Sequence, residues 1–261
     1  MTSTDQPLLL RDDVDGITTL TLNRPKQFNP LSSEMIATLS DTLHEIGRDE
    51  SVRVVIIAGS GKAFSAGHDL REMRSTDDSA FIVDLFNRCA DMMLTITHIP
   101  QPVIARVNGI ATAAGCQLVA NCDLAIASDT ARFAVSGINL GLACSSPIVP
   151  LSRNILRKRA MEMLLTGDFI DAETATEYGL INRAVPADEL ESATLTLAEK
   201  IRAKPAVSIG IGKQSFYRQL PLDLSEAYAL GADRMACNMD TDEAREGFDA
   251  FLEKRKPSWA V

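Results

Sequence analysis

Residues 111–115 form a run of small residues whose backbone could take part in catalysis. Ala113, Ala114 and Gly115 carry little or no side chain, so a ligand could approach the backbone closely. A helical pattern begins at about Thr112, which places the N–H of Ala114 among the unpaired donors of a first helical turn, at the positive end of the helix dipole. Such a donor suits an oxygen that becomes negative during a reaction. The same residues would also suit a tightly packed helix start.

Several common catalytic motifs do not occur in the chain. There is no G-x-S-x-G nucleophile elbow and no G-x-G-x-x-G dinucleotide fingerprint. The stretch Gly59–Lys62 resembles a phosphate loop, but Ile56 occupies the position where a Walker A loop needs its first glycine. The three histidines are scattered, and no H-E-x-x-H helix exists. We therefore predict no metal site.

Composition restricts the remaining function classes. The chain of 261 residues carries a net charge of -9, without the basic face that nucleic acid requires, so we expect no nucleic-acid partner. Its five cysteines form no C-x-x-C pair and predict reduced thiols. Met1–Asp13 lacks the pattern of a signal peptide, and no apolar run approaches the roughly 18 residues needed to span a membrane. We expect a cytoplasmic protein without membrane insertion.

The elements that would position the small-residue run alternate between strand and helix. Short apolar, β-branched runs predict strands buried on both faces, and runs with three- and four-residue spacing predict helices between them. The strands are expected at 8–10, 16–22, 52–58, 102–107 and 124–127. The helices are expected from Ser32–Ser33 onward and at 80–97, 112–121, 172–178, 188–203 and 222–252, the last interrupted. Strands are expected to stop after about Pro147. The order predicts an α/β fold.

Two segments resemble the signature stretches of the crotonase (enoyl-CoA hydratase/isomerase) superfamily. They are Ala58–Leu70 and the stretch from Ile99 to Ala125, and the likeness runs from about Leu8 to Trp259. Within the family, residues 65–70 and 111–120 look most like the subgroup called enoyl-CoA hydratase domain-containing protein three. The string Ser65–Asp69 also resembles methylmalonyl-CoA decarboxylase.

The resemblance implies a fold and an assembly. We expect a crotonase (ClpP-like) α/β fold, made of repeated β-β-α units with two roughly perpendicular sheets. A core at residues 1–200 would be followed by a helical C-terminal trimerisation region at 201–261. The partner would be a second copy of the chain, in a homotrimer or a dimer of trimers.

The resemblance also implies a ligand and its contacts. The family binds acyl-coenzyme A (acyl-CoA) thioesters as substrates, with no covalently bound cofactor. The N–H groups of His68 and Ala114 match its enolate-oxygen donors. Arg24 and Lys26 match phosphate contacts, and the backbone around Ala63, Ser65 and Ala66 matches the adenine pocket. Phe251 and Lys254 match residues that a neighbouring subunit often contributes.

Two positions depart from the family pattern. Hydratases use two glutamates, and Gln117 and Gly137 stand where these belong. Glutamine accepts no proton near neutral pH and glycine has no side chain, so each loss removes an acid or base worth roughly 10²–10⁴-fold. Cys144, Ser145 and Ser146 occupy a stretch near the acyl group, where Ser145 could act on the substrate. They would otherwise line the pocket or cap a helix.

Four functions stay open at this point. The family default is an enoyl-CoA hydratase or isomerase of fatty acyl-CoA metabolism, in which hydration would be weak or absent. Decarboxylation of a malonyl-type CoA needs no essential general base. A non-catalytic acyl-CoA binder would keep the pocket and lose the glutamates. A structural partner in a hetero-oligomer would need neither.

Overall fold

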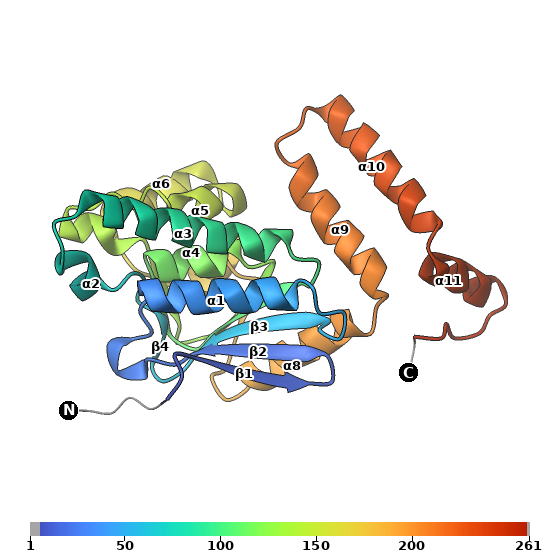
Figure 1. Ribbon diagram of the computed structural model, residues 1–261, viewed down its shortest axis with the longest axis horizontal. Helices are drawn as coiled ribbons and strands as arrows, with labels where there is room; N and C mark the ends of the chain where they lie inside the picture. Colours follow the sequence, from blue (N-terminus) through green and yellow to red (C-terminus); the bar gives the residue numbers. More distant parts are fainter. Residues whose placement is uncertain (1–5, 260–261) are drawn as a thin grey trace.

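The computed structural model describes residues 6–259 and contains two β-sheets (Figure 1). The larger has the order β1-β2-β3-β5-β7-β10, in which β1 is antiparallel to β2 and the other neighbours are parallel. These strands are β1 (Leu9–Val14), β2 (Ile17–Leu22), β3 (Val54–Gly59), β5 (Val103–Val107), β7 (Leu124–Ser128) and β10 (Arg183–Val185). The smaller sheet comprises β4 (Ala63–Ser65), β6 (Ile110–Thr112), β8 (Arg132–Ala134) and β9 (Ile170–Asp171). Residues 1–5 of the predicted N-terminal segment and residues 260–261 of the C-terminal region lie outside the described residues.

The chain repeats one supersecondary unit three times. In each unit the first strand (β3, β5 or β7) joins the larger sheet and the second (β4, β6 or β8) joins the smaller one, after which helices follow. This is the predicted succession of β-β-α units. The α-helices between the N-terminus and residue 202 are α1 (Ser33–Ile46), α2 (Leu70–Arg74), α3 (Ser79–His98), α4 (Ala114–Asn121), α5 (Ile148–Asn154), α6 (Arg157–Thr166), α7 (Ala172–Tyr178) and α8 (Leu190–Arg202). Two short 3-10 helices are η1 (Pro25–Gln27) and η2 (Ser136–Leu140).

The larger sheet is covered on both faces. Val55 and Ile57 of β3 pack into the main core with α1, α3 and α4, whereas Val54 and Ile56 point to the other face and pack against α8. All four side chains are fully buried. Burial on both faces explains why the strand is continuously apolar, as predicted.

The structure corrects three sequence-based expectations. Strands do not stop after Pro147, because β9 and β10 complete the two sheets; with two and three residues they are too short to show periodicity. Thr112 belongs to β6, and α4 begins at Ala114. Neither Ser145 nor Ser146 caps α5, whose preceding residue is Pro147 and which has no side-chain cap.

Three helices follow α8 and extend away from the sheets (Figure 1). They are α9 (Ala206–Gln219), which was not predicted, α10 (Leu224–Met239) and α11 (Asp242–Leu252). The predicted interruption of the 222–252 segment is confirmed at Asp240 and Thr241, and the Thr241 hydroxyl caps α11 by accepting from the N–H of Ala244. No helix among residues 6–259 combines the length and apolarity needed to cross a bilayer.

A buried ion pair fastens α9 to the core. Lys213 Nζ lies 2.7 Å from Asp123 Oδ2 and donates to the carbonyls of Ile96 and Gln101 at 2.7 and 2.8 Å. Tyr217 Oη donates to Asp123 Oδ1 at 2.8 Å. The two charged side chains are 6% and 14% exposed, so desolvation lowers the pKa of Lys213 despite the neighbouring carboxylate. Lys213 Nζ has three oxygen partners and both carboxylate oxygens of Asp123 are bound, so the loss of one partner is costly.

Helix α4 begins in direct contact with strand β4. A Cβ added to Gly115, the second residue of α4, would lie 2.2 Å from the carbonyl oxygen of Ser65. A Cβ on Gly67, whose φ is +90°, would lie 3.1 Å from the backbone nitrogen of Ala114. Glycine at these two positions therefore allows the turn after β4 and the start of α4 to touch through their backbones.

Replacing Lys213 with methionine tests the ion pair. We expect Lys213→Met to lower the free energy of unfolding by roughly 3–5 kcal/mol, because Asp123 would be left buried without its cation. Lys200→Met, on an exposed position of α8, should change it by no more than about 0.5 kcal/mol. Urea unfolding followed by circular dichroism measures both. Equal, small effects would show that the pair does not hold α9.

Replacing Gly115 with alanine tests the backbone contact. Gly115→Ala should destabilise the fold by at least about 1–3 kcal/mol, because the methyl group meets a strand carbonyl that cannot move aside. Gly212→Ala is the matched control, since a Cβ on this α9 glycine meets nothing within 4 Å. It should stabilise the protein by about 0.5–1 kcal/mol. Thermal unfolding measures the stability of both variants. A Gly115→Ala variant as stable as the native protein would contradict the backbone contact.

Candidate active site

A cleft of about 720 Å³ brings together four of the predicted site residues, Arg24, Lys26, Ala66 and His68. They come from the segment around η1 and from the turn between β4 and α2, which are distant in sequence. A backbone hydrogen bond of 2.7 Å from Leu31 N–H to the carbonyl of Gly67 joins the two segments. The cleft is therefore formed where the loop after β2 lies against the loop after β4.

Two backbone N–H groups remain free beside this cleft. A Cβ added to Gly67 would lie 3.0 Å from the Cβ of Ala113 and 3.1 Å from the nitrogen of Ala114. The amides of His68 and Ala114 therefore belong to two turns that are in contact. Among residues 6–259, neither N–H donates to another protein group, whereas the N–H of Ala113 donates to Ala134 at 3.0 Å. Ala114 is the first residue of α4, where an amide has no partner within the helix. Two free donors on adjoining turns can bind one oxygen anion.

Ala113 adopts a strained conformation between these groups. Its φ of +50° and ψ of -121° lie in a region that residues with a Cβ rarely occupy. A strained residue of this kind costs of the order of 1–3 kcal/mol and persists only where its surroundings hold it. Here the hydrogen bond from the Ala113 N–H to Ala134 and the contact with Gly67 hold it.

His68 lines the cleft and is half-buried. Its Nδ1 lies 3.2 Å from the carbonyl oxygen of Leu31, and its ring packs edge-on against Phe86 of α3 at 5.2 Å between centroids. Burial lowers the pKa of His68 below 6.5, while the Leu31 carbonyl and the Glu72 carboxylate partly oppose the shift. The ring is therefore neutral at pH 7.

Two carboxylates near His68 have structural partners. Asp69 caps α2 by accepting from the N–H groups of Arg71 and Glu72 at 2.9 and 3.2 Å. Glu72 accepts from the N–H of Ser33 at 2.9 Å and so links α2 to the start of α1. These contacts give both carboxylates a structural role.

The basic residues of the cleft differ in their freedom. Arg24 is half-buried, and its Nη1 donates to the carbonyls of Gln6, Pro7 and Asn23. Lys26 is exposed in η1. Arg24 therefore holds the N-terminal segment against the loop, and Lys26 is the more available cation for an anionic ligand.

Ala63 and Ser65 are not among the residues that line the cleft but are buried in β4, next to Ala66, which does line it. Sequence reasoning missed the residue that organises this strand. Asn29, fully buried with a φ of +52°, donates through Nδ2 to the carbonyls of Ser60 and Ala63 at 2.9 and 2.8 Å. Ser65 Oγ donates to the carbonyl of Asn29 at 2.8 Å. The available signal was an asparagine in a loop, a residue type that favours positive φ.

Gln117 is buried in α4, with 4% of its surface exposed, and its Oε1 has no hydrogen-bond partner among the described residues. A buried amide oxygen without a partner is costly unless a ligand or water satisfies it. It lies one turn along the helix from the free Ala114 amide. Gln117 is thus able to offer an amide to a bound molecule.

Gly137 is buried, and the sulfur of Cys144 takes the space beside it. A Cβ on Gly137 would lie 2.6 Å from Cys144 Sγ and 2.8 Å from the carbonyl oxygen of Leu142. Burial raises the pKa of the Cys144 thiol, so the thiol stays protonated at pH 7. Ser145, in contrast, is exposed and makes only a 3.5 Å contact with the carbonyl of Ala143. The structure leaves no room for a longer side chain at residue 137.

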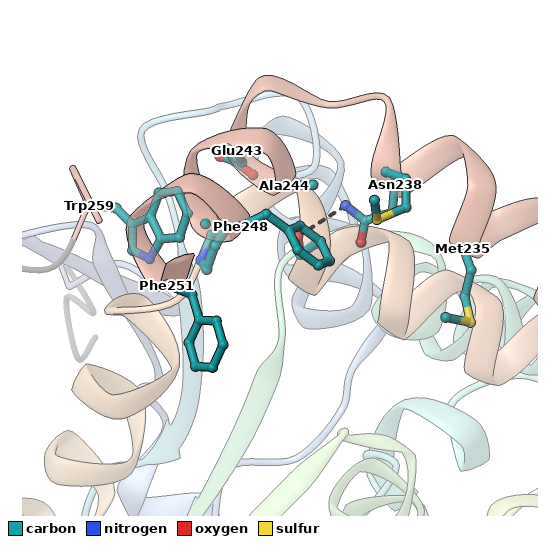
Figure 2. Close-up of a pocket in the computed structure, with 11 residues that line it drawn as sticks. Met235, Asn238, Glu243, Ala244, Phe248, Phe251 and Trp259 are labelled. Carbon is teal, nitrogen blue, oxygen red and sulfur yellow. Dashed lines mark hydrogen bonds between the residues drawn. The ribbon is translucent and has the colours of Figure 1, made fainter. Parts of the chain in front are cut away.

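Phe251 and Lys254 are not brought to the cleft within one chain. Phe251, at the end of α11, is 80% exposed and lines a separate pocket of about 400 Å³ in the C-terminal helices, with Phe248, Met235 and Trp259 (Figure 2). Lys254 follows α11 with a φ of +56°. Figure 1 places α11 at the opposite end of the molecule from α2.

The chain is similar to several known proteins. A family profile described as enoyl-CoA hydratase/isomerase matches residues 12–261. The mouse enoyl-CoA hydratase domain-containing protein 3, mitochondrial, is 44% identical over 247 residues, which is 94% of this chain and 82% of the relative. The human protein of that name is 44% identical over 248 residues, 95% and 82% of the two chains.

Solved structures show the same fold. The crystal structure of an enoyl-CoA hydratase from Mycobacterium smegmatis has a TM-score of 0.96 and 55% identity, covering 97% of this chain and 99% of that one. The structure of human enoyl-CoA hydratase domain-containing protein 3 has a TM-score of 0.94 and 42% identity, covering 97% and 100%. The predicted crotonase fold and the predicted likeness to that subgroup are confirmed.

The relatives overturn one prediction. The mouse, rat, human and Xenopus laevis proteins are named mitochondrial, so the predicted cytoplasmic location is wrong. Free thiols indicate a reducing compartment but do not distinguish one such compartment from another.

The fold, the position of the cleft and the match over nearly the whole chain lead to one conclusion: the chain belongs to the enoyl-CoA hydratase/isomerase family of the crotonase superfamily.

Proposed function

We propose that the protein binds an acyl-CoA thioester and stabilises the enolate oxygen formed from it, using the N–H groups of His68 and Ala114. The observation that carries this proposal is the pair of unpartnered amides on two turns pressed together by Gly67. Because these donors are fixed by the fold, they need no reorganisation when negative charge develops on the thioester oxygen.

The cleft supports the coenzyme A part of the ligand. Lys26 and Arg24 would contact phosphates, and the backbone at Ala63, Ser65 and Ala66 would border the adenine. Coenzyme A enters as part of the substrate, and no covalent cofactor is required.

The C-terminal helices support an assembly in which one chain completes the cleft of another. Large apolar side chains of these helices are exposed, among them Phe251 at 80% and Tyr228 at 73%. Burial of such a surface favours association. In a homotrimer or a dimer of trimers, Phe251 and Lys254 of one copy would reach the ligand of its neighbour.

Hydration is the weaker part of the family's chemistry in this chain. Gln117 cannot take a proton from water near pH 7, and Cys144 fills the space beside Gly137. Each absent acid or base removes roughly 10²–10⁴-fold in rate. The oxyanion donors alone would leave slow hydration.

A second candidate, decarboxylation of a malonyl-type CoA, is favoured by the buried amide of Gln117. Loss of carbon dioxide generates the same enolate without a general base, and the Nε2 group of such an amide can donate a hydrogen bond that orients the departing carboxylate. Ser145 is too exposed to orient it alone.

A paired binding and product assay tests the proposed function. Calorimetry with acetyl-, crotonyl- and malonyl-CoA should show binding of all three, weakened by salt because the phosphate contacts are ionic. Mass spectrometry of the mixtures should show little hydrated crotonyl-CoA and release of carbon dioxide from the malonyl ester. Binding without any product would instead indicate a non-catalytic acyl-CoA binder, and no binding would refute the assignment.

Gln117→Glu separates the two candidate reactions. A carboxylate at residue 117 should raise crotonyl-CoA hydration by at least ~10-fold, because it supplies one base. It should also slow malonyl-CoA decarboxylation by at least ~10-fold, because it repels the substrate carboxylate. Gln219→Glu, at the end of α9, is the control and should change neither rate. Unchanged rates in Gln117→Glu would show that residue 117 does not face the acyl group.

A further inference from the structure

The fold leaves a basic lone pair unpaired at the half-buried His68, which borders the cleft. A carbonyl oxygen only accepts hydrogen bonds, so the 3.2 Å contact with Leu31 places a proton on Nδ1. In the neutral ring the other nitrogen, Nε2, then keeps its lone pair. The edge-on contact with Phe86 fixes the ring plane. The tautomer and orientation of the ring are thus set before any ligand arrives.

The carboxylates at the cleft are bound to backbone or exposed. The Asp69 carboxylate accepts from two backbone N–H groups and the Glu72 carboxylate from one, and Glu34 of α1 is exposed. The Cys144 thiol is kept protonated by burial, and Gln117 is neutral. A proton leaving a substrate carbon therefore finds its acceptor in the imidazole.

The imidazole belongs to a residue that borders the cleft. It is attached to the residue whose own N–H would bind the thioester oxygen, and His68 is among the residues that line the cleft. The proposal requires Nε2 to reach the carbon next to the thioester carbonyl. A base must lie within hydrogen-bond reach of the proton it removes, directly or through one water.

We propose that the His68 imidazole transfers a proton to and from the α-carbon of the bound thioester, in place of the absent glutamates. Nε2 takes the α-proton, the C–H electron pair forms the C1–C2 double bond, and the carbonyl π electrons move to the oxygen held by the two amides. The reverse step returns a proton from Nε2 to the carbon. Because the proton on Nε2 can exchange with water, the cycle replaces α-hydrogen by deuterium in D₂O. This inference rests on the proposed function.

The test is α-deuterium incorporation into butyryl-CoA in D₂O, measured by mass spectrometry on the full-length protein. His68→Asn keeps the backbone N–H and can keep a side-chain donor to Leu31 but has no basic nitrogen. We expect it to bind butyryl-CoA within about threefold of the native affinity and to lose roughly 10²–10⁴-fold in exchange rate. His44→Asn, on the exposed face of α1, makes the same chemical change away from the cleft and should exchange normally.

The pH profile gives a readout that a purely structural role would not move. The charged groups that line the cleft with His68 are Arg24, Lys26, Glu34, Asp69, Arg71 and Glu72. Burial outweighs them and lowers the pKa of His68, so exchange should rise with pH to a plateau through a midpoint below 6.5. The rise should vanish in His68→Asn.

The outcomes distinguish proton transfer by His68 from acyl-CoA binding itself. Retained exchange with an unchanged pH profile in His68→Asn overturns the inference, and so does loss of exchange in Glu72→Gln alone, which would identify Glu72 as the base. Binding without exchange in the native protein refutes proton transfer but leaves acyl-CoA binding intact. Failure of the native protein to bind butyryl-CoA refutes the proposed function and this inference together.

Discussion

The site depends on one close backbone contact, between the turn after β4 and the start of α4. Gly115 has no room for a Cβ beside the Ser65 carbonyl, and Gly67 faces the nitrogen of Ala114. Side chains at these positions would separate the two turns by the thickness of a methyl group or more, and their free amides would no longer share one oxygen. The strained Ala113 follows from the same contact, since a relaxed turn would direct the Ala114 amide elsewhere. Much of the surrounding fold, including the parallel strands β4 and β6, keeps these turns together.

Two positions expected to carry carboxylates from the family resemblance hold neutral groups in this chain. A glutamine stands at residue 117, and at residue 137 a glycine faces a protonated thiol. The proposed oxyanion donors and the proposed coenzyme A cleft do not depend on carboxylates at these two positions, because they are built from backbone and from a different loop. Under the proposed function, enolate stabilisation and hydration would therefore be separable, and only hydration would be weakened.

The sequence predicted most of the fold, for identifiable reasons, and four of the candidate site residues lie together in the structure. Continuous β-branched runs located the core strands because these strands are buried on both faces. The strands β9 and β10 were not predicted because two or three residues are too few to show an alternation of apolar and polar side chains. Helix α9 was not predicted because its apolar residues do not form a clear stripe along one face. Arg24, Lys26, Ala66 and His68 were predicted and share a cleft. Asn29 was missed because its role depends on carbonyls that only the folded loops bring together. That Cys144 fills the space beside Gly137 was likewise unpredictable, since it depends on the path of the loop after η2.

Difference infrared spectroscopy of a bound acyl-CoA with a ¹³C-labelled thioester carbonyl tests the central claim most directly. If the N–H groups of His68 and Ala114 both point at that oxygen, they polarise the C=O bond. We expect its stretching band to move to a lower frequency than in water and to sharpen into a single population. A band that stays at its frequency in water, or moves upward as in an apolar pocket, would contradict the claim that these two amides bind the thioester oxygen.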